Sequence, residues 1–287
     1  MMSVVGKVKE IWRYPVKSMQ GESLSVASFQ ELGIPGDREW ALKDEVSGEI
    51  RGAKKFPKLM QCQARYLSEP TGSHSEPVEI MLPNGDPVAT SDANVNEVLS
   101  KYLDREVSLH PRRPATDLDH YKRRVPLTEE ELRDVLAREP DESLPDLSLL
   151  PSEIVSEITE FTSPRGTYFD AYPVHLITTS WLNALSSANP ASRFEAPRFR
   201  PNLLIEGASE GFAELDWCGK ALRIGEVIFE CQIPTLRCGM TTQATADLPK
   251  DGQVLRTIVR GSEQNVGIYA TTKTPGAINV GDAVTLV

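Results

Sequence analysis

The sequence predicts a mainly β protein with some α-helix, organised as two barrel-like parts joined by a strongly acidic segment. Short apolar runs alternate with polar residues, and turns containing glycine or proline interrupt them at short intervals. Many short strands with such turns are typical of β-sandwiches and β-barrels. The 287 residues, 40% apolar and 25% charged, have ordinary globular composition and room for one large domain or two intimate ones.

The first part, residues 1–115, is dominated by strand patterns. Asn84-Gly85 stands between two apolar runs and predicts a hairpin, because this pair accepts the backbone of a tight two-residue turn. Residues 92–103 are the exception, with apolar side chains at helical spacing that predict an amphipathic helix. Strands are expected at residues 4–12, 39–42 and 79–82.

Most of the net charge of the chain lies within the joining segment, residues 116–165. Within residues 126–160, eleven acids oppose two arginines, a charge of −9 out of −10 for the chain. Thr128 followed by three glutamates predicts a helix start, because the hydroxyl caps free amides and the acids face the positive helix end. We interpret the segment as a solvated excursion between the two parts. A lid, or a docking face for a basic redox partner, are the functional alternatives.

The second part, residues 166–287, repeats the short-strand pattern. Thr179 or Ser180 is expected to cap a helix that runs through Trp181 and Leu185. Strands are expected at residues 175–179, 202–205, 221–224, 227–230 and 268–270, with two more within 276–286.

Several function classes are disfavoured. With 31 basic and 41 acidic residues, the chain does not have the charge of a nucleic-acid binder. No apolar run approaches the ~20 residues that cross a bilayer, and no signal peptide is apparent, so we expect a soluble cytoplasmic protein. The four cysteines form no CxxC motif and predict no disulfide framework. Dinucleotide, Walker, GxSxG and HExxH motifs are absent from the sequence.

Two residue clusters near the N-terminus could bind an anion. Lys17 and Ser18 follow the first predicted strand and offer an ammonium, a hydroxyl and turn amides, which are the groups that hold a phosphate. Arg38 follows a Pro-Gly turn, and its structural interpretation is an ion pair with Asp37 that closes the turn.

A third cluster combines two segments of the second part. Arg200 and Asn202 lie two apart in a segment predicted to be extended, so both side chains would point to one face. Arg237 precedes Cys238, and a neighbouring guanidinium favours the thiolate, which is the nucleophile and the metal ligand. Gly239 lets another group approach this backbone closely. A thiolate in a basic pocket suits a soft-ligand metal or sulfur transfer.

In this order, the clusters resemble the MOSC proteins. The likeness is greatest to the two-part type, a MOSC N-terminal β-barrel domain followed by a MOSC β-barrel domain with short helices. That group includes the mitochondrial amidoxime-reducing components and the bacterial YcbX proteins. The motifs that carry the resemblance are YPVKS from residue 14, GDREWAL from 36, AKKFPKL from 53, RFRPNLLI from 198, LRCGMTT from 236 and PGAINVGDAV from 275.

The resemblance implies a molybdenum cofactor, Mo-molybdopterin. Cys238 would be the one protein thiolate on molybdenum and the catalytic residue, while Lys17, Ser18 and Arg38 would hold the pterin and its phosphate. Because Lys17 and Cys238 must approach one ligand, we expect a cleft lined by both parts. The residues that would complete the pocket from the second part are Thr178, Arg200, Asn202, Arg237 and Tyr269.

The implied activity is reduction of N-hydroxylated compounds, such as amidoximes and hydroxylamines, by a molybdenum-dependent oxidoreductase. No ferredoxin-like cysteine cluster is present, so electrons would come from a separate reductase or carrier of ferredoxin or cytochrome type. Two alternatives stay open. One is a sulfur carrier or transferase with a persulfide on Cys238, for which Lys17 is a candidate pyridoxal phosphate site. The other is a non-catalytic cofactor carrier that docks a client through the acidic segment.

Overall fold

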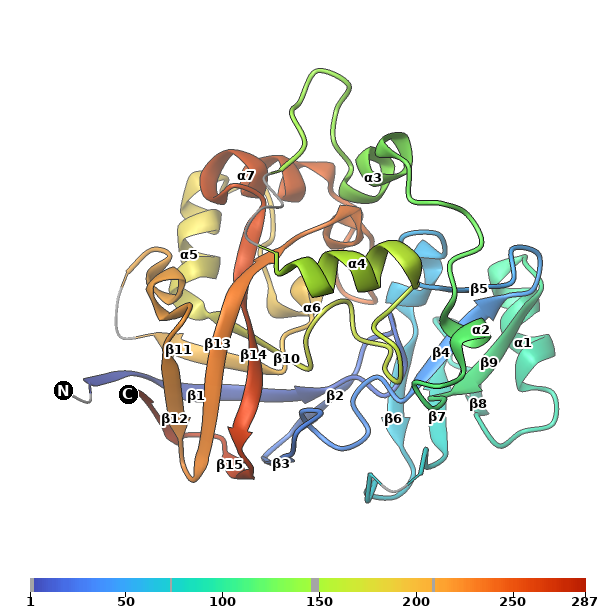
Figure 1. Cartoon of the computed structure of the whole chain (residues 1–287), viewed down its shortest axis with the longest axis horizontal. Coiled ribbons are helices and arrows are strands. Elements are labelled where there is room, and N and C mark those ends of the chain that lie inside the picture. The colour runs from blue at the N-terminus through green and yellow to red at the C-terminus, as the bar shows by residue number, and fades with distance from the viewer. Residues whose placement is uncertain (1–2, 73, 146–149, 208–209) are drawn as a thin grey trace.

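Seven strands close into a β-barrel that contains the first strand of the chain (Figure 1). The computed structural model describes residues 3–72, 74–145, 150–207 and 210–287. Strand β1 (Ser3–Arg13) pairs with β16 on one side and β11 on the other, and so closes the barrel. The other barrel strands are β10 (Val174–Thr178), β11 (Leu203–Gly207), β12 (Ala221–Ile224), β13 (Val227–Leu236), β14 (Asn265–Thr274) and β16 (Ala283–Leu286).

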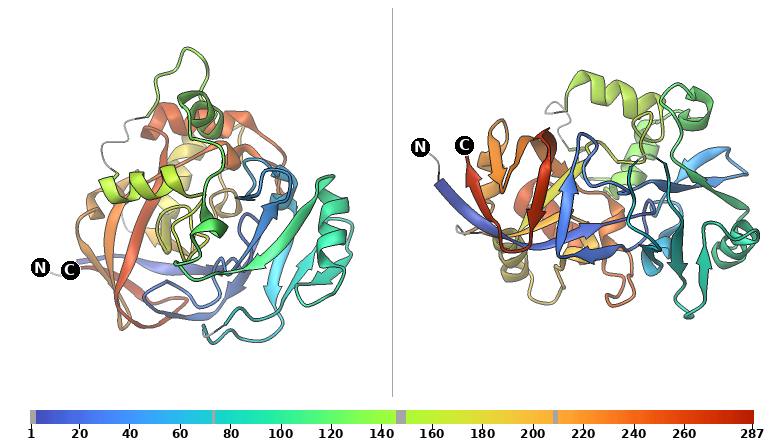
Figure 2. Two further views of the ribbon diagram at one scale, coloured as in Figure 1. Left: turned by 45° about the vertical axis from the view of Figure 1, so that its right-hand side comes forward. Right: turned by 90° about the horizontal axis from the view of Figure 1, so that it is seen from below.

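The alternation of β1 explains how it fits this barrel. Val8 and Ile11 are buried in the barrel core, while Lys7 and Lys9 point to solvent. A bulge between Val8 and Glu10 keeps both apolar side chains inside although they are three residues apart. Figure 2 shows β1 running across the molecule, from the barrel toward the N-terminal sheets. The predicted domain boundaries at residues 115 and 165 stay predictions, but the first strand is built into the barrel of the second part.

The rest of the N-terminal part consists of small antiparallel sheets and one helix. The hairpin predicted at Asn84-Gly85 is confirmed, because β7 pairs with β8 around this turn. The predicted helix begins at Val95 and buries Leu99 against the sheets. The sheet elements are β4 (Trp40–Asp44), β5 (Glu49–Arg51) and β9 (Val107–Pro111), then β6 (Gln63–Tyr66), β7 (Val78–Met81) and β8 (Pro87–Ala89), beside α1 (Val95–Leu103).

The pairing of the C-terminal strands differs from what their order in the sequence suggests. The last two predicted strands are present but do not pair with each other: β15 (Gly276–Asn279) pairs with β3 (Val26–Phe29), and β16 pairs with β1 and β12. Helices α5 (Thr179–Ala188) and α7 (Gly252–Ser262) pack together at Trp181 and Ile258. The sequence analysis missed α7, whose two glycines and β-branched residues weaken its helix propensity.

The acidic segment leaves the N-terminal part and returns to the same place. An isolated bridge joins Lys122 to Phe161 at its base. The excursion holds α3 (Glu129–Leu136) and α4 (Ser152–Glu160), after the short α2 (Leu118–Tyr121). The predicted cap is confirmed, because the amide of Glu131 donates to the hydroxyl of Thr128 at 3.1 Å. Asp146, one of the eleven acids, lies outside the described residues.

Within the part of the chain that the structure describes, none of the helices has the length and apolar character needed to cross a bilayer.

Candidate functional site

A cleft lies where the N-terminal part meets the closed barrel. Arg38 enters it from the N-terminal part, and Arg237 and Tyr269 enter it from barrel strands and their loops. Both parts therefore line one cleft, but Lys17 and Cys238, on which the prediction of a shared cleft was based, are not among its lining residues. The lining residues are Arg38, Asp170, Tyr172, His175, Phe199, Arg200, Asn202, Arg237, Met240 and Tyr269.

Asp37 joins the two parts beneath the cleft. Its buried carboxylate accepts hydrogen bonds from the amide of Tyr14 at 2.7 Å and from Nδ2 of Asn202 at 3.0 Å. The same carboxylate forms an ion pair with Arg38, so the predicted structural pair is present. Asn202 in turn accepts from the amide of His175 at 3.1 Å. The turn at residue 37 thus fixes the barrel strands as well as its own loop.

Three of the predicted cofactor-binding residues have left-handed backbone conformations. The φ angles are 70° at Ser18, 53° at Arg38 and 51° at Arg200. Positive φ costs a non-glycine residue energy and is often found at functional sites. The extended conformation predicted around Arg200 is wrong, because this residue ends the short helix α6 (Ala196–Phe199). Arg200 and Asn202 nevertheless reach the same cleft, since the left-handed cap redirects the chain after α6.

Positive charge exceeds negative charge in the cleft. Burial and, to a smaller extent, the nearby Arg38 together lower the pKa of Arg200 to about 10, and burial also lowers the pKa of Arg237. Arg200 donates only to main-chain oxygens, of Met19 at 3.0 Å and Val16 at 3.3 Å. In the described residues, Nε of Arg237 has no hydrogen-bond partner. The charged side chains that line the cleft are Arg38, Arg200 and Arg237 against Asp170, and the pair Lys17 and Asp37, behind and beneath it, adds no net charge.

This excess fits an anionic ligand. A buried cation with no counter-ion destabilises a folded protein. A bound phosphate would supply the missing negative charge to the guanidinium groups of Arg200 and Arg237. The residues present therefore fit a phosphate-bearing cofactor on electrostatic grounds.

Lys17 lies behind the cleft and reaches it through Asp170. Its ammonium donates to the carboxylate of Asp170 at 2.9 Å and to the carbonyl of Tyr168 at 2.8 Å. Burial lowers the pKa of Lys17, and Asp170 opposes this effect. Desolvation raises the pKa of Asp170, but Lys17 and Lys54 more than offset it, so this carboxyl stays ionised.

Cys238 lies half-buried beside the cleft and packs against Ala53, Met60 and Met240. Ser18 does not line the cleft, but its hydroxyl accepts from the amide of Ala53 at 2.9 Å. Ser18 therefore positions the loop that contacts Cys238. The other three cysteines are free, as expected, and burial raises the pKa of Cys62 and Cys231 to about 12, which keeps them protonated.

His175 and Tyr269 stand side by side on paired strands. Their rings lie 5.7 Å apart, and Nε2 of His175 is 3.5 Å from Nη1 of Arg237. Burial, and then Arg237, lower the pKa of His175 well below its usual value, so the ring is neutral at pH 7. His175 is buried, and it also lines the cleft.

Thr178, like Ser18, is a predicted site residue that does not line the cleft. It caps α5, with its hydroxyl accepting from the amide of Trp181 at 3.1 Å, where Thr179 or Ser180 had been expected. The hydroxyl also donates to Oε1 of Glu214 at 2.6 Å.

The buried Glu214 carboxyl, which pairs with Thr178, predicts that the stability of the protein depends on pH. Desolvation raises the pKa of this buried carboxyl from 4.5 to about 7, so the folded state binds a proton more tightly than the unfolded chain. The free energy of unfolding should fall as pH rises through that window, by about 3 kcal/mol from this group. Urea unfolding at pH 5 and pH 8 measures the fall, and Glu214→Gln should abolish most of it. An unchanged pH dependence in that variant would contradict the assignment.

Asp170, Tyr172 and Met240 were missed from the sequence. Asp170 and Tyr172 belong to an aromatic-rich stretch just before β10, and an acid among aromatic residues at a strand start is the signal that could have drawn attention to it. Met240 lies inside the quoted LRCGMTT motif, but nothing in its residue type pointed to the cleft.

Two family profiles match the chain. The profile of the MOSC N-terminal beta barrel domain matches residues 5–107, and that of the MOSC domain matches residues 164–285. The chain belongs to the MOSC-domain proteins. Both profiles leave most of the acidic excursion outside their limits, so this MOSC protein carries α3 and α4 as an addition to the two matched domains.

Curated relatives of this MOSC protein carry two kinds of name. A molybdenum cofactor sulfurase of Oryza sativa subsp. japonica is 28% identical over an alignment of 277 positions, which covers 87% of this chain but only 29% of the relative. Mitochondrial amidoxime-reducing component 1 of Homo sapiens is 25% identical over 316 residues, covering 100% of this chain and 84% of the relative. Among solved structures, the YuaD protein of Bacillus subtilis aligns with a TM-score of 0.45 and 13% identity, over 100% of this chain and 98% of that one.

Proposed function

We propose that this protein binds a molybdenum cofactor and reduces N-hydroxylated compounds with electrons from a separate protein. The observation that carries the proposal is the excess of buried positive charge in the cleft, beside a half-buried thiol on the loop after β13. The mitochondrial amidoxime-reducing components, which align over nearly the whole chain, support the class of reaction.

The residues would divide the work as follows. Arg38, Arg200 and Arg237 would bind the phosphate and orient the pterin, with Lys17 behind them. Asn202 and Tyr269 would offer an amide and a hydroxyl as hydrogen-bonding groups, and Cys238 would ligate the metal. Bound molybdenum would supply two-electron redox chemistry. The balanced reaction consumes two electrons and two protons per N–O bond, and yields the amine or amidine and one water.

The test is metal content together with turnover. Protein made in a host that synthesises the cofactor should hold close to one molybdenum atom per chain and, with reduced methyl viologen as donor, convert benzamidoxime to benzamidine. The same chain made in a host lacking the cofactor is the control and should do neither. No molybdenum in the first preparation would contradict the proposal.

Sulfur transfer is the second candidate, because a molybdenum cofactor sulfurase is among the relatives. In that case Cys238 would gain the mass of one sulfur atom after incubation with a cysteine desulfurase and cysteine. A loaded protein that reduces no N-hydroxylated compound, yet activates a cofactor-free molybdenum enzyme, would instead identify a cofactor carrier.

A further inference from the structure

Helix α3 of the acidic excursion contacts the chain next to Cys238. A Cβ atom on Gly239 would lie only 3.2 Å from Cβ of Ala137, the residue that ends α3. The glycine predicted to allow a close approach therefore does so, and the approaching group is the acidic excursion itself. Ala53 packs against Cys238, and two residues further Nζ of Lys55 lies 3.1 Å from the Asp134 carboxylate of α3. The helix thus contacts two segments that neighbour the thiol, at Gly239 and at Lys55.

A buried glutamine ties the end of α3 to the cleft. Nε2 of Gln264 donates to the carbonyl of Leu136 at 3.0 Å and to the carbonyl of Arg237 at 2.8 Å. The amide of Arg237 donates back to the carbonyl of Gln264 at 2.8 Å. One side chain therefore fixes α3 relative to the residue that precedes Cys238.

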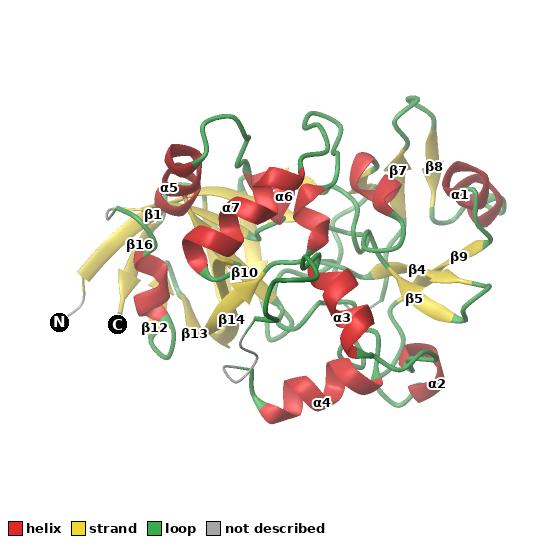
Figure 3. Ribbon diagram, turned by 90° about the horizontal axis from the view of Figure 1, so that it is seen from above, coloured by secondary structure: helices red, strands yellow, loops and turns green. Residues whose placement is uncertain are grey.

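Charged side chains hold α3 from both parts of the molecule. Arg256 of α7 donates to the carbonyl of Ala137 and to the carboxylate of Glu142. On the opposite side, Arg51 of β5 lies 4.0 Å from the carboxylate of Glu131. Figure 3 shows α3 between α7 and the pair β4 and β5. The helix thus spans the junction that also forms the cleft.

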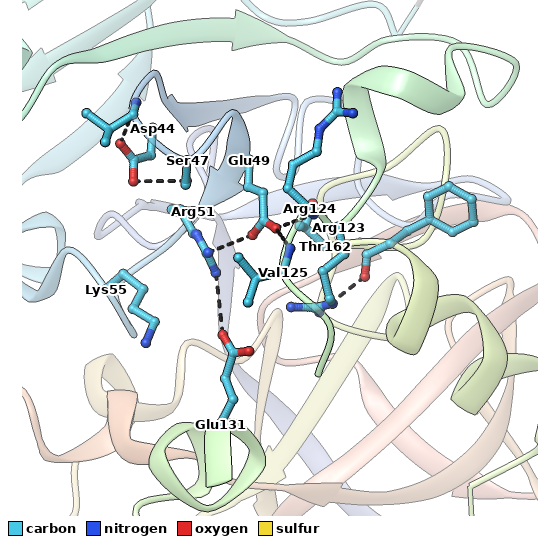
Figure 4. Close-up of polar contacts among 12 residues, drawn as sticks. Asp44, Ser47, Glu49, Arg51, Lys55, Arg123, Arg124, Val125, Glu131 and Thr162 are labelled. Carbon is cyan, nitrogen blue, oxygen red and sulfur yellow. Dashed lines mark hydrogen bonds and ion pairs between the residues drawn. The ribbon is translucent and has the colours of Figure 1, made fainter. Parts of the chain in front are cut away.

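Strand β5 also holds the start of the acidic excursion, through Arg51 and Glu49. Arg51 pairs with Glu49 at 2.7 Å, and the Glu49 carboxylate accepts from the amides of Arg124 and Val125 (Figure 4). The buried carboxylate of Glu49 therefore holds the backbone that leads into α3. By contrast, α3 itself buries only Leu136, so polar contacts hold it more than apolar packing does. A helix held this way opens locally at lower cost than a core element.

We infer that α3 and the following residues 137–142 limit the size of the molecules that reach Cys238, and so select among substrates. The helix contacts Gly239 and the loop of Ala53, which flank the thiol, and its anchors lie on both parts of the chain. Selection among substrates rests on the proposed function, whereas control of access to the thiol does not. A small group would reach Cys238 with α3 in place, and a bulky one only when α3 moves away.

Thiol labelling of the cofactor-free full chain tests access without molybdenum or substrate. Iodoacetamide is the small probe and fluorescein maleimide the bulky one, and mass spectrometry of the Cys238 peptide gives each rate. Arg256→Gln and Lys55→Gln each weaken one anchor of α3 at a partly exposed position. Arg256→Gln should accelerate maleimide labelling of Cys238 by about tenfold, with a smaller effect on iodoacetamide. Lys55→Gln removes an exposed ion pair and should accelerate it by about twofold, again with a smaller effect on iodoacetamide.

Arg165→Gln is the matched control, because it removes the ion pair with Glu157 of α4 without touching α3. It should leave both rates unchanged, as should labelling of Cys218 in every variant. Unchanged maleimide rates in both anchor variants would overturn the inference. Equal acceleration of both probes, or acceleration by the control as well, would also overturn it, because neither is a size-dependent effect of α3. If labelling responds as expected but no N-hydroxylated compound is reduced, only the proposed function fails.

Discussion

Cys238→Ala should lose bound molybdenum and benzamidoxime reduction together. Among the described residues, Cys238 is the cysteine beside the basic cleft, and its removal would take away the thiolate proposed to bind the metal. Loss of a supporting group alone commonly lowers metal affinity 10–100-fold, so loss of the ligand should exceed about 100-fold. Elemental analysis and turnover of the same preparation measure both effects. The free energy of unfolding of the cofactor-free variant should change by less than about 1 kcal/mol, since Cys238 is half-buried.

Cys218→Ala is the matched control for this prediction. Cys218 is also free and half-buried, but it packs beside the barrel core, away from the cleft residues. Its variant should keep wild-type molybdenum and turnover. A Cys238→Ala protein that retained both would exclude the thiol as ligand and catalytic residue, while a variant with metal but no turnover would separate the two roles.

Asp37→Ala should destabilise the cofactor-free protein by about 3–5 kcal/mol. The buried carboxylate accepts from Tyr14 and Asn202 and pairs with Arg38, so its removal leaves two donors and one charge without their partner. Arg38 would then add to the positive charge already uncompensated in the cleft. Equilibrium unfolding in urea at pH 7 measures the loss.

An exposed ion pair provides the control for Asp37. Asp119 pairs with Arg124 at 2.7 Å on the surface, and Asp119→Ala should leave the free energy of unfolding close to that of the wild type, because water screens an exposed ion pair. Added sulfate should recover part of the stability lost in Asp37→Ala, because an anion bound in the cleft stabilises the folded state. A loss below about 1 kcal/mol would show that Asp37 does not join the two parts as described.

Local structure followed from local sequence in several places. Thr128 caps α3 and Asn84-Gly85 makes a hairpin, because both depend on residues only a few positions apart. The helix cap before Trp181 was expected at Thr179 or Ser180, one or two residues late, because three consecutive hydroxyl residues offer equivalent local signals. Thr178 takes the role because its hydroxyl also pairs with Glu214, which lies 36 residues further along the chain.

The chemistry of the candidate site was also readable in the residue types. Basic residues near both ends of the chain and one thiol after an arginine predicted an anion-binding cleft, and Arg38, Arg200, Asn202, Arg237 and Tyr269 line one. The left-handed conformation of Arg200 was not readable, because nothing in its neighbours favours that backbone over an extended one. Asp170 was missed because its importance comes from Lys17, more than 150 residues away.

The sequence by itself determined where strands alternate, where helices are capped and which side chains could bind an anion or a soft metal. These properties depend on side-chain type and short-range spacing. Only the tertiary structure decided that β1 closes the barrel of the C-terminal part, and that α3 lies against Gly239 beside Cys238. Both are pairings between distant segments, whose register depends on burial and charge across the whole molecule rather than on any local pattern.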